Sequence, residues 1–128
     1  MDYYFAKELE LTFDEAVRAV TDALSREGFG VLTQIDVKAT LKDKLDVDFR
    51  EYRILGACNP PLAHRALMSE KWIGIMLPCN VVVQETETGT VEVAAVDPLA
   101  AMASVDNSEL GPVAQEAQGK LRAVIENL

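Results

Sequence analysis

Short stretches in which apolar and polar residues alternate are separated along this chain by stretches with helical spacing. Alternation with a period of two predicts strands, whereas apolar residues three and four positions apart predict helices. The predicted strands span residues 3–11, 30–37, 49–57, 73–84 and 90–96. Helices are predicted over residues 13–27, 38–45, 60–71, 98–104 and 109–127.

The same patterns predict which side chains face inward. The inner face of the first strand is predicted to hold Tyr3, Phe5, Leu9 and Leu11. One face of the second strand is predicted to hold Val31, Thr33, Ile35 and Val37. The last helix is predicted to bury a stripe made of Val113, Ala117, Leu121, Val124 and Leu128.

Residues that typically start and stop helices support these boundaries. Thr12 and Glu15 have the spacing of a capping box, in which each side chain accepts a hydrogen bond from the other residue's amide. Gly28 suits the left-handed position that ends a helix. Asp97 followed by Pro98 is typical of a helix start, and residues 85–89 indicate a hairpin connection between the last two strands.

The order of these elements favours an α+β fold. Strands and helices alternate without a strict βαβ repeat, and the last two strands form a hairpin. We therefore expect a two-layer sandwich with a mostly antiparallel sheet of about five strands and helices on one face. No repeat, low-complexity tract or linker is visible, so one domain is expected over residues 1–128.

The charge of the chain argues against some partners. With 21 acidic and 12 basic residues the net charge is −9, whereas nucleic-acid binding needs a basic surface that displaces counterions from phosphates. The longest nearly apolar run, residues 72–79, is far shorter than the roughly 20 residues of a membrane helix. The first residues lack the basic start and apolar middle of a signal peptide. We expect a cytoplasmic protein with no nucleic-acid or membrane partner.

The candidate chemistry lies at the two cysteines, each of which is followed by asparagine and bordered by proline. Pro60 suits the first position of a helix, and Asn59 is then its cap. Cys58 is predicted to lie one residue outside this helix, where free amides and the helix dipole favour a thiolate or a bound anion. Cys58 is thus a candidate nucleophile, with the alternative that it only fills space in the core.

Cys79 follows Pro78, and a proline within a strand predicts a bulge or an edge position. If the strand that ends at Cys58 and the strand that begins near residue 73 are antiparallel neighbours, the two thiols are roughly 20 Å apart. If these strands run parallel, the thiols can approach each other. The sequence leaves both arrangements open.

No metal or nucleotide site is indicated. His64, the only histidine, falls on the polar side of its predicted helix and is expected to face solvent or a partner subunit. A zinc site made from His64, Cys58 and Cys79 would lack a fourth ligand and a closely spaced cysteine pair. No glycine-rich phosphate loop is present, so we expect no cofactor.

Three motifs resemble the domain-of-unknown-function 302 family. They are Gly-Ala-Cys-Asn-Pro at residues 56–60, Leu-Pro-Cys-Asn and three valines at residues 77–83, and Asp-Pro at residues 97–98. The resemblance covers nearly the whole chain. It implies a curved antiparallel sheet in a TATA-binding-protein-like arrangement, and small bacterial and archaeal relatives that can form dimers. It implies no activity, cofactor or catalytic residue.

Three hypotheses for function come from different classes. The favoured one is a module that binds a small molecule or anion in a pocket near Cys58 and Cys79, with Asn59 and Pro78 in its lining. The second is a homodimeric interaction domain that has structural cysteines and uses the free edge of its sheet. The third, a thiol-dependent redox protein or enzyme, would use Cys58 as nucleophile and Cys79 as resolving thiol, and it requires a neighbouring base. Enzymatic function is the less favoured interpretation.

Overall fold

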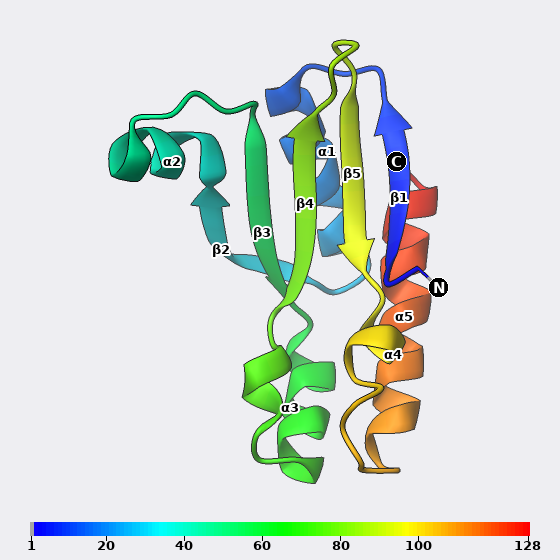
Figure 1. Ribbon diagram of the computed structural model, residues 1–128. Coiled ribbons are helices and arrows are strands. Elements are labelled where there is room, and N and C mark those ends of the chain that lie inside the picture. Colours follow the sequence, from blue (N-terminus) through cyan, green and yellow to red (C-terminus); the bar gives the residue numbers. More distant parts are fainter. Residues whose placement is uncertain (1) are drawn as a thin grey trace.

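Five antiparallel strands form one open sheet in the order β1-β5-β4-β3-β2 (Figure 1). The computed structural model describes residues 2–128. The strands are β1 (Tyr4–Leu9), β2 (Gly30–Asp36), β3 (Tyr52–Cys58), β4 (Cys79–Glu85) and β5 (Val91–Val96). All four neighbouring pairs are antiparallel, so the predicted α+β fold with an antiparallel sheet is confirmed.

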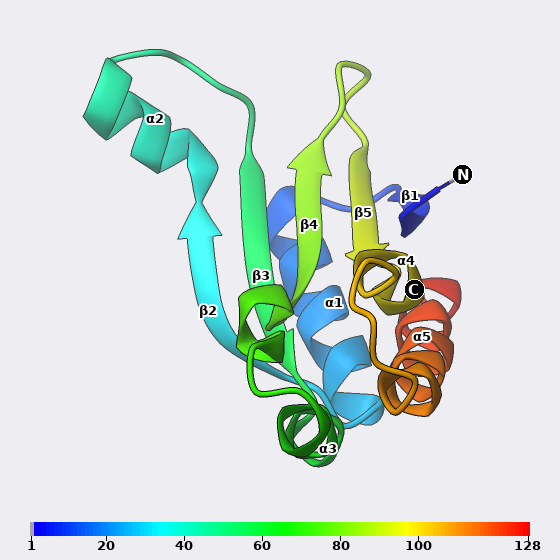
Figure 2. The same ribbon diagram turned by 60° about the horizontal axis from the view of Figure 1, so that its bottom comes forward.

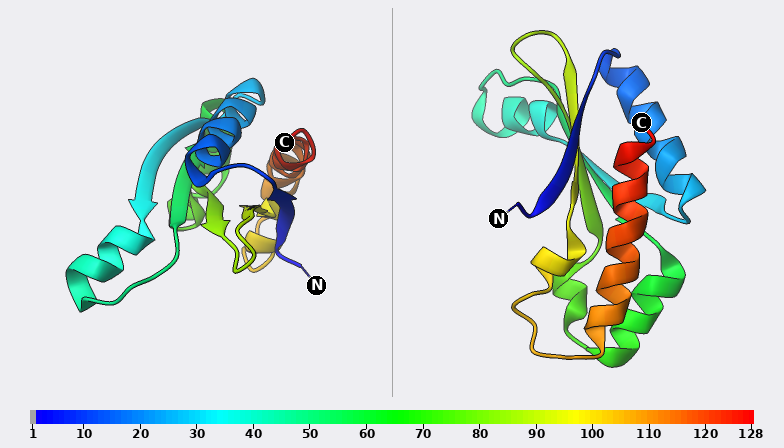
Figure 3. Two further views of the ribbon diagram at one scale, coloured as in Figure 1. Left: turned by 90° about the horizontal axis from the view of Figure 1, so that it is seen from above. Right: turned by 90° about the vertical axis from the view of Figure 1, so that its right-hand side faces the viewer.

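Two long helices, α1 (Phe13–Arg26) and α5 (Leu110–Glu126), cover one face of this sheet (Figure 3). The shorter segments are α2 (Val37–Leu45), α3 (Pro60–Ser69), the 3₁₀ helix η1 (Ile73–Met76) and α4 (Pro98–Ala101). α3 and η1 lie beyond one end of the sheet, whereas α2 stands away from the rest of the molecule next to β2 (Figures 1 and 2). Within residues 2–128, no helix combines the length and the apolar composition that crossing a membrane requires.

The main core lies between the sheet and the two long helices. The strands contribute side chains that are almost completely buried: Leu55, Val81, Val83, Val93 and Ala95. Facing them in the helix layer are Ala16, Val20, Leu24, Leu121 and Val124. Removing this apolar surface from water is the main favourable term in folding. The predicted stripe on the last helix is confirmed, except that Leu128 lies beyond the helix end and is only half-buried.

Local hydrogen bonds set the helix ends where the sequence predicts them. Thr12 Oγ1 accepts from the Glu15 amide at 3.2 Å, and the Glu15 carboxylate accepts from the Thr12 amide at 3.0 Å. Hydrogen bonding by Thr12, first from its backbone amide and then from its side chain, lowers the pKa of the Glu15 carboxyl. Gly28 has a φ of 83° just after α1. At the start of α4, Asp97 Oδ1 accepts from the Leu99 amide at 3.0 Å. These three predictions are confirmed.

The predicted strand over residues 73–84 is wrong in its first half. Residues 73–76 form η1, and β4 begins only at Cys79. Pro78, which follows a cis peptide bond, precedes the strand instead of forming a bulge or edge position within it. Proline has no amide to donate to a ladder, and Ile73 is buried in a second small core with residues of α3 and α5. The apolar run over residues 73–84 therefore contributes side chains to both cores, and only its second half forms a strand.

A bulge in β2 changes its predicted alternation. Val31 pairs with Ala57 on the face that the helices cover, whereas Thr33 pairs with Gly56 on the opposite face. The register shifts between Val31 and Thr33, because a bulge adds one residue to a strand. The prediction that these two side chains share a face is therefore wrong.

The first strand is shorter than predicted. Leu11 lies beyond the end of β1 and is exposed. Tyr3 precedes β1 and is also exposed, with its ring centroid 5.1 Å from that of Tyr4. Phe5 and Leu9 pack against the main core as predicted.

Candidate functional site

The two cysteines lie on neighbouring strands. Cys58 ends β3, and Cys79 begins β4 directly opposite Ala57 in the antiparallel ladder. The separation of roughly 20 Å predicted for antiparallel strands is wrong, because the residues before Cys79 form η1 and a turn rather than part of the strand. Both cysteines are free and half-buried.

The setting of Cys79 opposes thiol chemistry. Burial and, to a smaller extent, the nearby Cys58 together raise the pKa of this thiol to about 11. A thiol with that pKa is protonated at neutral pH, whereas the thiolate is the reactive form.

His64 is exposed on α3, as predicted. Within residues 2–128, no group of three His, Cys, Asp or Glu side chains is arranged to hold a metal ion.

Asn59 connects two helices. Its side-chain oxygen accepts from the Leu62 amide at 3.3 Å and caps α3 as predicted, while its amide nitrogen donates to the Glu27 carbonyl at 3.3 Å. Gly28 leaves room for this contact, since a Cβ at that position would lie 3.0 Å from the Asn59 amide nitrogen. Both ends of this buried amide are therefore engaged inside the protein.

Pro78 and Cys79 line a small hollow of about 240 Å³ together with Met76 and Met102. Pro78 also packs over Gly56 of β3, where a Cβ would lie 2.8 Å from Pro78 Cγ and 2.2 Å from Thr33 Oγ1. Cys58 and Asn59 are not among the residues that line this hollow. Of the four residues predicted to bind a ligand, the structure thus places two at one cavity.

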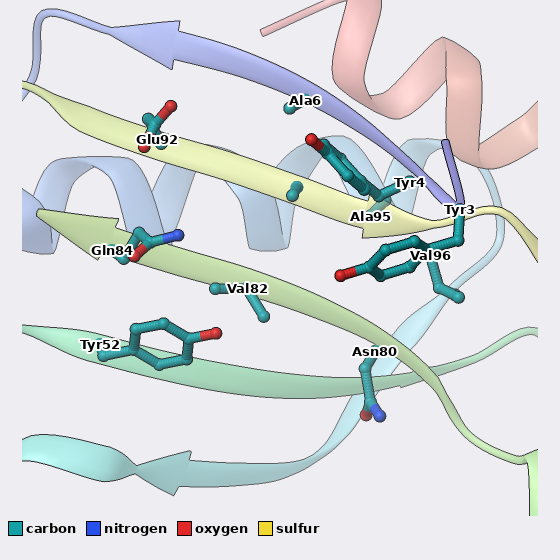
Figure 4. A pocket seen from close by; sticks show the side chains of 11 residues that line it. Tyr3, Tyr4, Ala6, Tyr52, Asn80, Val82, Gln84, Glu92, Ala95 and Val96 are labelled. Atoms are coloured by element: carbon teal, nitrogen blue, oxygen red, sulfur yellow. The ribbon is translucent and has the colours of Figure 1, made fainter. Parts of the chain in front are cut away.

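A larger hollow, of about 450 Å³, lies on the sheet face that the helices leave uncovered (Figure 4). We call it the open-face hollow; its lining comprises Tyr3, Tyr4, Ala6, Tyr52, Asn80, Val82, Gln84, Glu92, Ala94, Ala95 and Val96. The sheet register builds its floor. Ala6 of β1 is opposite Ala94 of β5, and Ala94 is opposite Val82 of β4, so three small apolar side chains lie side by side.

Aromatic rings border this floor on two sides. Tyr52 comes from β3, Tyr4 is the first residue of β1, and Tyr3 directly precedes it. Figure 4 shows the hydroxyl ends of Tyr3 and Tyr52 pointing toward the middle of the hollow. A tyrosine ring offers an apolar surface and one hydrogen-bonding group. The rim can therefore hold a flat apolar body and bond to its polar edge.

Polar side chains lie at both ends of the hollow. Asn80 is at one end, and Gln84 and Glu92 lie opposite each other on β4 and β5 at the other. Gln84 Oε1 accepts from Arg50 at 2.8 and 3.0 Å, which leaves its amide nitrogen as a donor. The guanidinium of Arg50 lies 4.5 Å from the centre of the Phe49 ring. None of the lining residues is Lys, Arg or His, and Glu92 is the only carboxylate among them.

The two hollows adjoin, because Asn80 and Val96 line both of them. Pro78 and Cys79 therefore lie at one end of a longer groove whose main part is the open-face hollow.

Sequence reasoning misses the open-face hollow, because alternation in the first strand predicts Tyr4 and Ala6 only as residues of its outer face. A strand with one solvated face normally alternates, whereas a strand covered on both faces is continuously apolar. Residues 81–83 are three valines, and residues 93–96 are Val-Ala-Ala-Val. This continuous apolar pattern in the two central strands was the available signal.

The fold and the groove define an α+β domain whose antiparallel sheet is covered by helices on one face only. The chain belongs to the DUF302 family, a domain of unknown function, whose family model matches residues 5–128. A crystal structure of an uncharacterized conserved DUF302 protein from Bacillus stearothermophilus is similar over 98% of both chains, with 28% sequence identity and a TM-score of 0.91. No curated protein matches the chain. The resemblance based on the cysteine motifs is thus confirmed.

Proposed function

We propose that this protein is a binding module for a small, flat, uncharged molecule that occupies the open-face hollow. One observation carries the proposal. Val81 and Val83 of β4 are covered by helices, whereas Val82 between them faces the hollow and is only half-buried. Its cross-strand partner Ala94 on β5 is half-buried in the same way. A bound apolar molecule would cover side chains that folding alone leaves in contact with water.

The dimensions and the lining support this proposal. Small-molecule sites typically enclose about 300–1,000 Å³ and combine apolar and aromatic walls with a few polar groups. The open-face hollow has a volume of about 450 Å³. The rings of Tyr3 and Tyr52 can contact the faces or edges of a flat ligand, and Asn80 and Gln84 can bond to its polar atoms.

The charge of the lining favours an uncharged ligand over the anion predicted at the helix start next to Cys58. An anion in the open-face hollow would meet the Glu92 carboxylate and no cationic lining residue. At the start of α3, Asn59 already bonds to the Leu62 amide. Binding of a ligand by Cys58 and Asn59 remains a prediction without further support.

A thiol-dependent activity has less support than binding. Such an activity needs an ionised thiol and a partner that activates it. The raised pKa of Cys79 argues against its use as an ionised resolving thiol at neutral pH. The only histidine of the chain, His64, is exposed on α3.

Titration of isotope-labelled protein with indole tests the proposal. Indole is flat and uncharged, and indole carboxylate is its matched anion. We expect indole to shift the backbone amide signals of Ala6, Val82 and Ala94, and we expect indole carboxylate to shift them less because of Glu92. Saturable shifts confined to other parts of the chain, such as those near the exposed Trp72, would contradict the proposed site.

A further inference from the structure

The antiparallel register arranges the side chains of the open face in rows across the sheet. In one polar row, Gln84 of β4 lies between Glu92 of β5 and Tyr52 of β3. Glu8 of β1 lies opposite Glu92 at the outer end of this row. The next row is apolar and consists of Ala6, Ala94, Val82 and Ile54. The open-face hollow therefore has an apolar floor with a polar row along one border.

Gln84 is a hydrogen-bond donor with a fixed orientation. Arg50 Nε and Nη2 both donate to its Oε1, at 3.0 and 2.8 Å. A guanidinium has no acceptor and an amide nitrogen only donates, so these bonds determine which end of the Gln84 amide faces Arg50. The guanidinium is itself held over the rings of Phe49 and Tyr52, 4.5 and 5.4 Å from their centres. Figure 4 shows the Gln84 nitrogen pointing toward the middle of the hollow.

Glu92 is an acceptor directly beside this donor. Opposite residues on antiparallel strands have Cβ atoms about 4.5–5.5 Å apart. Among residues 2–128, the side-chain hydrogen bonds of the polar row run from Arg50 to Gln84 and from Thr90 to Glu8, and none of them engages Glu92. Like charges that lie opposite each other destabilise a sheet, so the neighbouring Glu8 favours a ligand that brings a donor to Glu92.

We propose that the preferred ligand of the open-face hollow is a flat cyclic amide, a ring in which a carbonyl group lies directly beside an N–H group. This inference rests on the proposed function and specifies its ligand. Gln84 Nε2 donates to the carbonyl oxygen, and the Glu92 carboxylate accepts from the ring N–H. The face of the ring covers the apolar floor at Ala94 and Val82, whose side chains are half-buried.

Other flat ligands leave part of the polar row without a partner. A ring with only an acceptor provides no donor for Glu92, and a ring with only an N–H provides no acceptor for the Gln84 nitrogen. Covering a polar group without giving it a partner costs free energy. A ring with a carboxylate would place a second negative charge next to Glu92. A cyclic amide is uncharged and engages both side chains.

Arg50 is a positioning residue for this ligand. It does not line the hollow, and it acts through the Gln84 oxygen that it holds. Without Arg50, the Gln84 amide can turn and present its oxygen to the ligand, which repels a carbonyl group. The preference for a cyclic amide therefore depends on Arg50, whereas contact with the apolar floor does not.

Three matched probes test the inference on the full wild-type chain by backbone amide shift titration. Oxindole is a cyclic amide, indole keeps the N–H but has no carbonyl, and N-methyloxindole keeps the carbonyl but has no N–H. We expect oxindole to bind about three- to tenfold more tightly than either of the others, which is the gain from one net hydrogen bond. Equal affinities at Ala6, Val82 and Ala94 would overturn the inference and leave the proposed function intact. If no probe shifts these amides, both are overturned.

Substitutions locate the preference in named side chains. Gln84→Glu keeps the shape of the side chain and its bond to Arg50 but replaces the donor with an acceptor, so oxindole should lose its advantage over indole. Arg50→Met should reduce the same advantage. Lys38→Met is the matched control, because Lys38 pairs with Glu51 at 3.3 Å and its removal should leave the advantage unchanged.

The readout in each variant is the ratio of the oxindole and indole affinities. A substitution that only lowers stability changes both affinities together and leaves this ratio as it is. An unchanged ratio in Gln84→Glu would overturn the assignment of the carbonyl to Gln84. An unchanged ratio in Arg50→Met, or a lost preference in Lys38→Met, would overturn the role of Arg50.

Discussion

The two faces of the sheet are built from the same strands but have different environments. On β4, Val81 and Val83 are completely buried beneath α1 and α5, whereas Val82 points to the open side and is half-buried. On β3, Leu55 is completely buried and its neighbour Ile54 is half-buried. Both faces carry apolar side chains, but only one face has a helix layer.

This difference distinguishes apolar residues that the fold needs from apolar residues that it does not need. Helices that bury the covered face account for the apolar residues there, because their burial is the main favourable term in folding. The apolar and aromatic residues of the open-face hollow have no such explanation. An apolar surface rimmed by polar groups commonly marks a binding site, and the proposed function assigns the open face that role.

The largest expected difference between the faces is in stability. Leu55→Ala removes a fully buried side chain and should lower the free energy of unfolding by about 2–5 kcal/mol. Ile54→Ala on the open face should cost about 1 kcal/mol, because its side chain is already partly in water. Urea denaturation of both variants measures the contrast. Equal losses would mean that the open face contributes to the core as much as the covered face does.

A smaller effect is expected at Gly56, where Thr33 and Pro78 approach the open face closely. Gly56→Ala would place a Cβ against Pro78 and Thr33 and should cost about 1–3 kcal/mol. Gly30→Ala is the matched control, because a Cβ at that position meets no atom within 4 Å. Urea denaturation measures both costs. If the Gly56→Ala variant is as stable as the Gly30→Ala variant, Pro78 and Thr33 do not pack tightly against Gly56.

The pH dependence of stability tests burial at the edge of the covered face. Burial raises the pKa of Cys79 from 9.0 to about 11, so the folded chain keeps this proton at a pH where the unfolded chain loses it. The stabilising contribution is therefore complete below pH 9.0 and declines as the pH rises toward about 11. Unfolding measured across this range should show a steeper decline for the wild type than for Cys79→Ala. Parallel declines would contradict the burial of this thiol.

Local rules predicted much of the fold. Capping at Thr12 and Asn59 and the helix start at Asp97 depend on hydrogen bonds within a few residues, so the sequence alone locates them. The predicted strand over residues 73–84 failed because Ile73 packs against α3 and against α5, and α5 is distant in sequence. The bulge in β2 also changed the face of Thr33, because register depends on the partner strand.

The candidate site was less predictable than the fold. The sequence predicts Pro78 and Cys79 as ligand-binding residues, and they lie at one end of the groove. The tyrosines were missed, because Tyr3 and Tyr52 are 49 residues apart in sequence and meet only through the strand order. The continuously apolar sequences of β4 and β5 predict that both faces of these strands are covered. They do not indicate what covers the open face.

The most direct test of the central claim is to fill the open-face hollow without disturbing the core. Ala94→Leu adds volume to the floor, and Ala103→Leu makes the same change at an exposed position outside the hollow. The measurement is the affinity for indole, taken from amide shift titrations of both variants and the wild type. We predict at least a roughly tenfold loss for Ala94→Leu, about 1.4 kcal/mol, and no loss for Ala103→Leu. Unchanged binding by a folded Ala94→Leu variant would contradict the assignment of this face as the binding site.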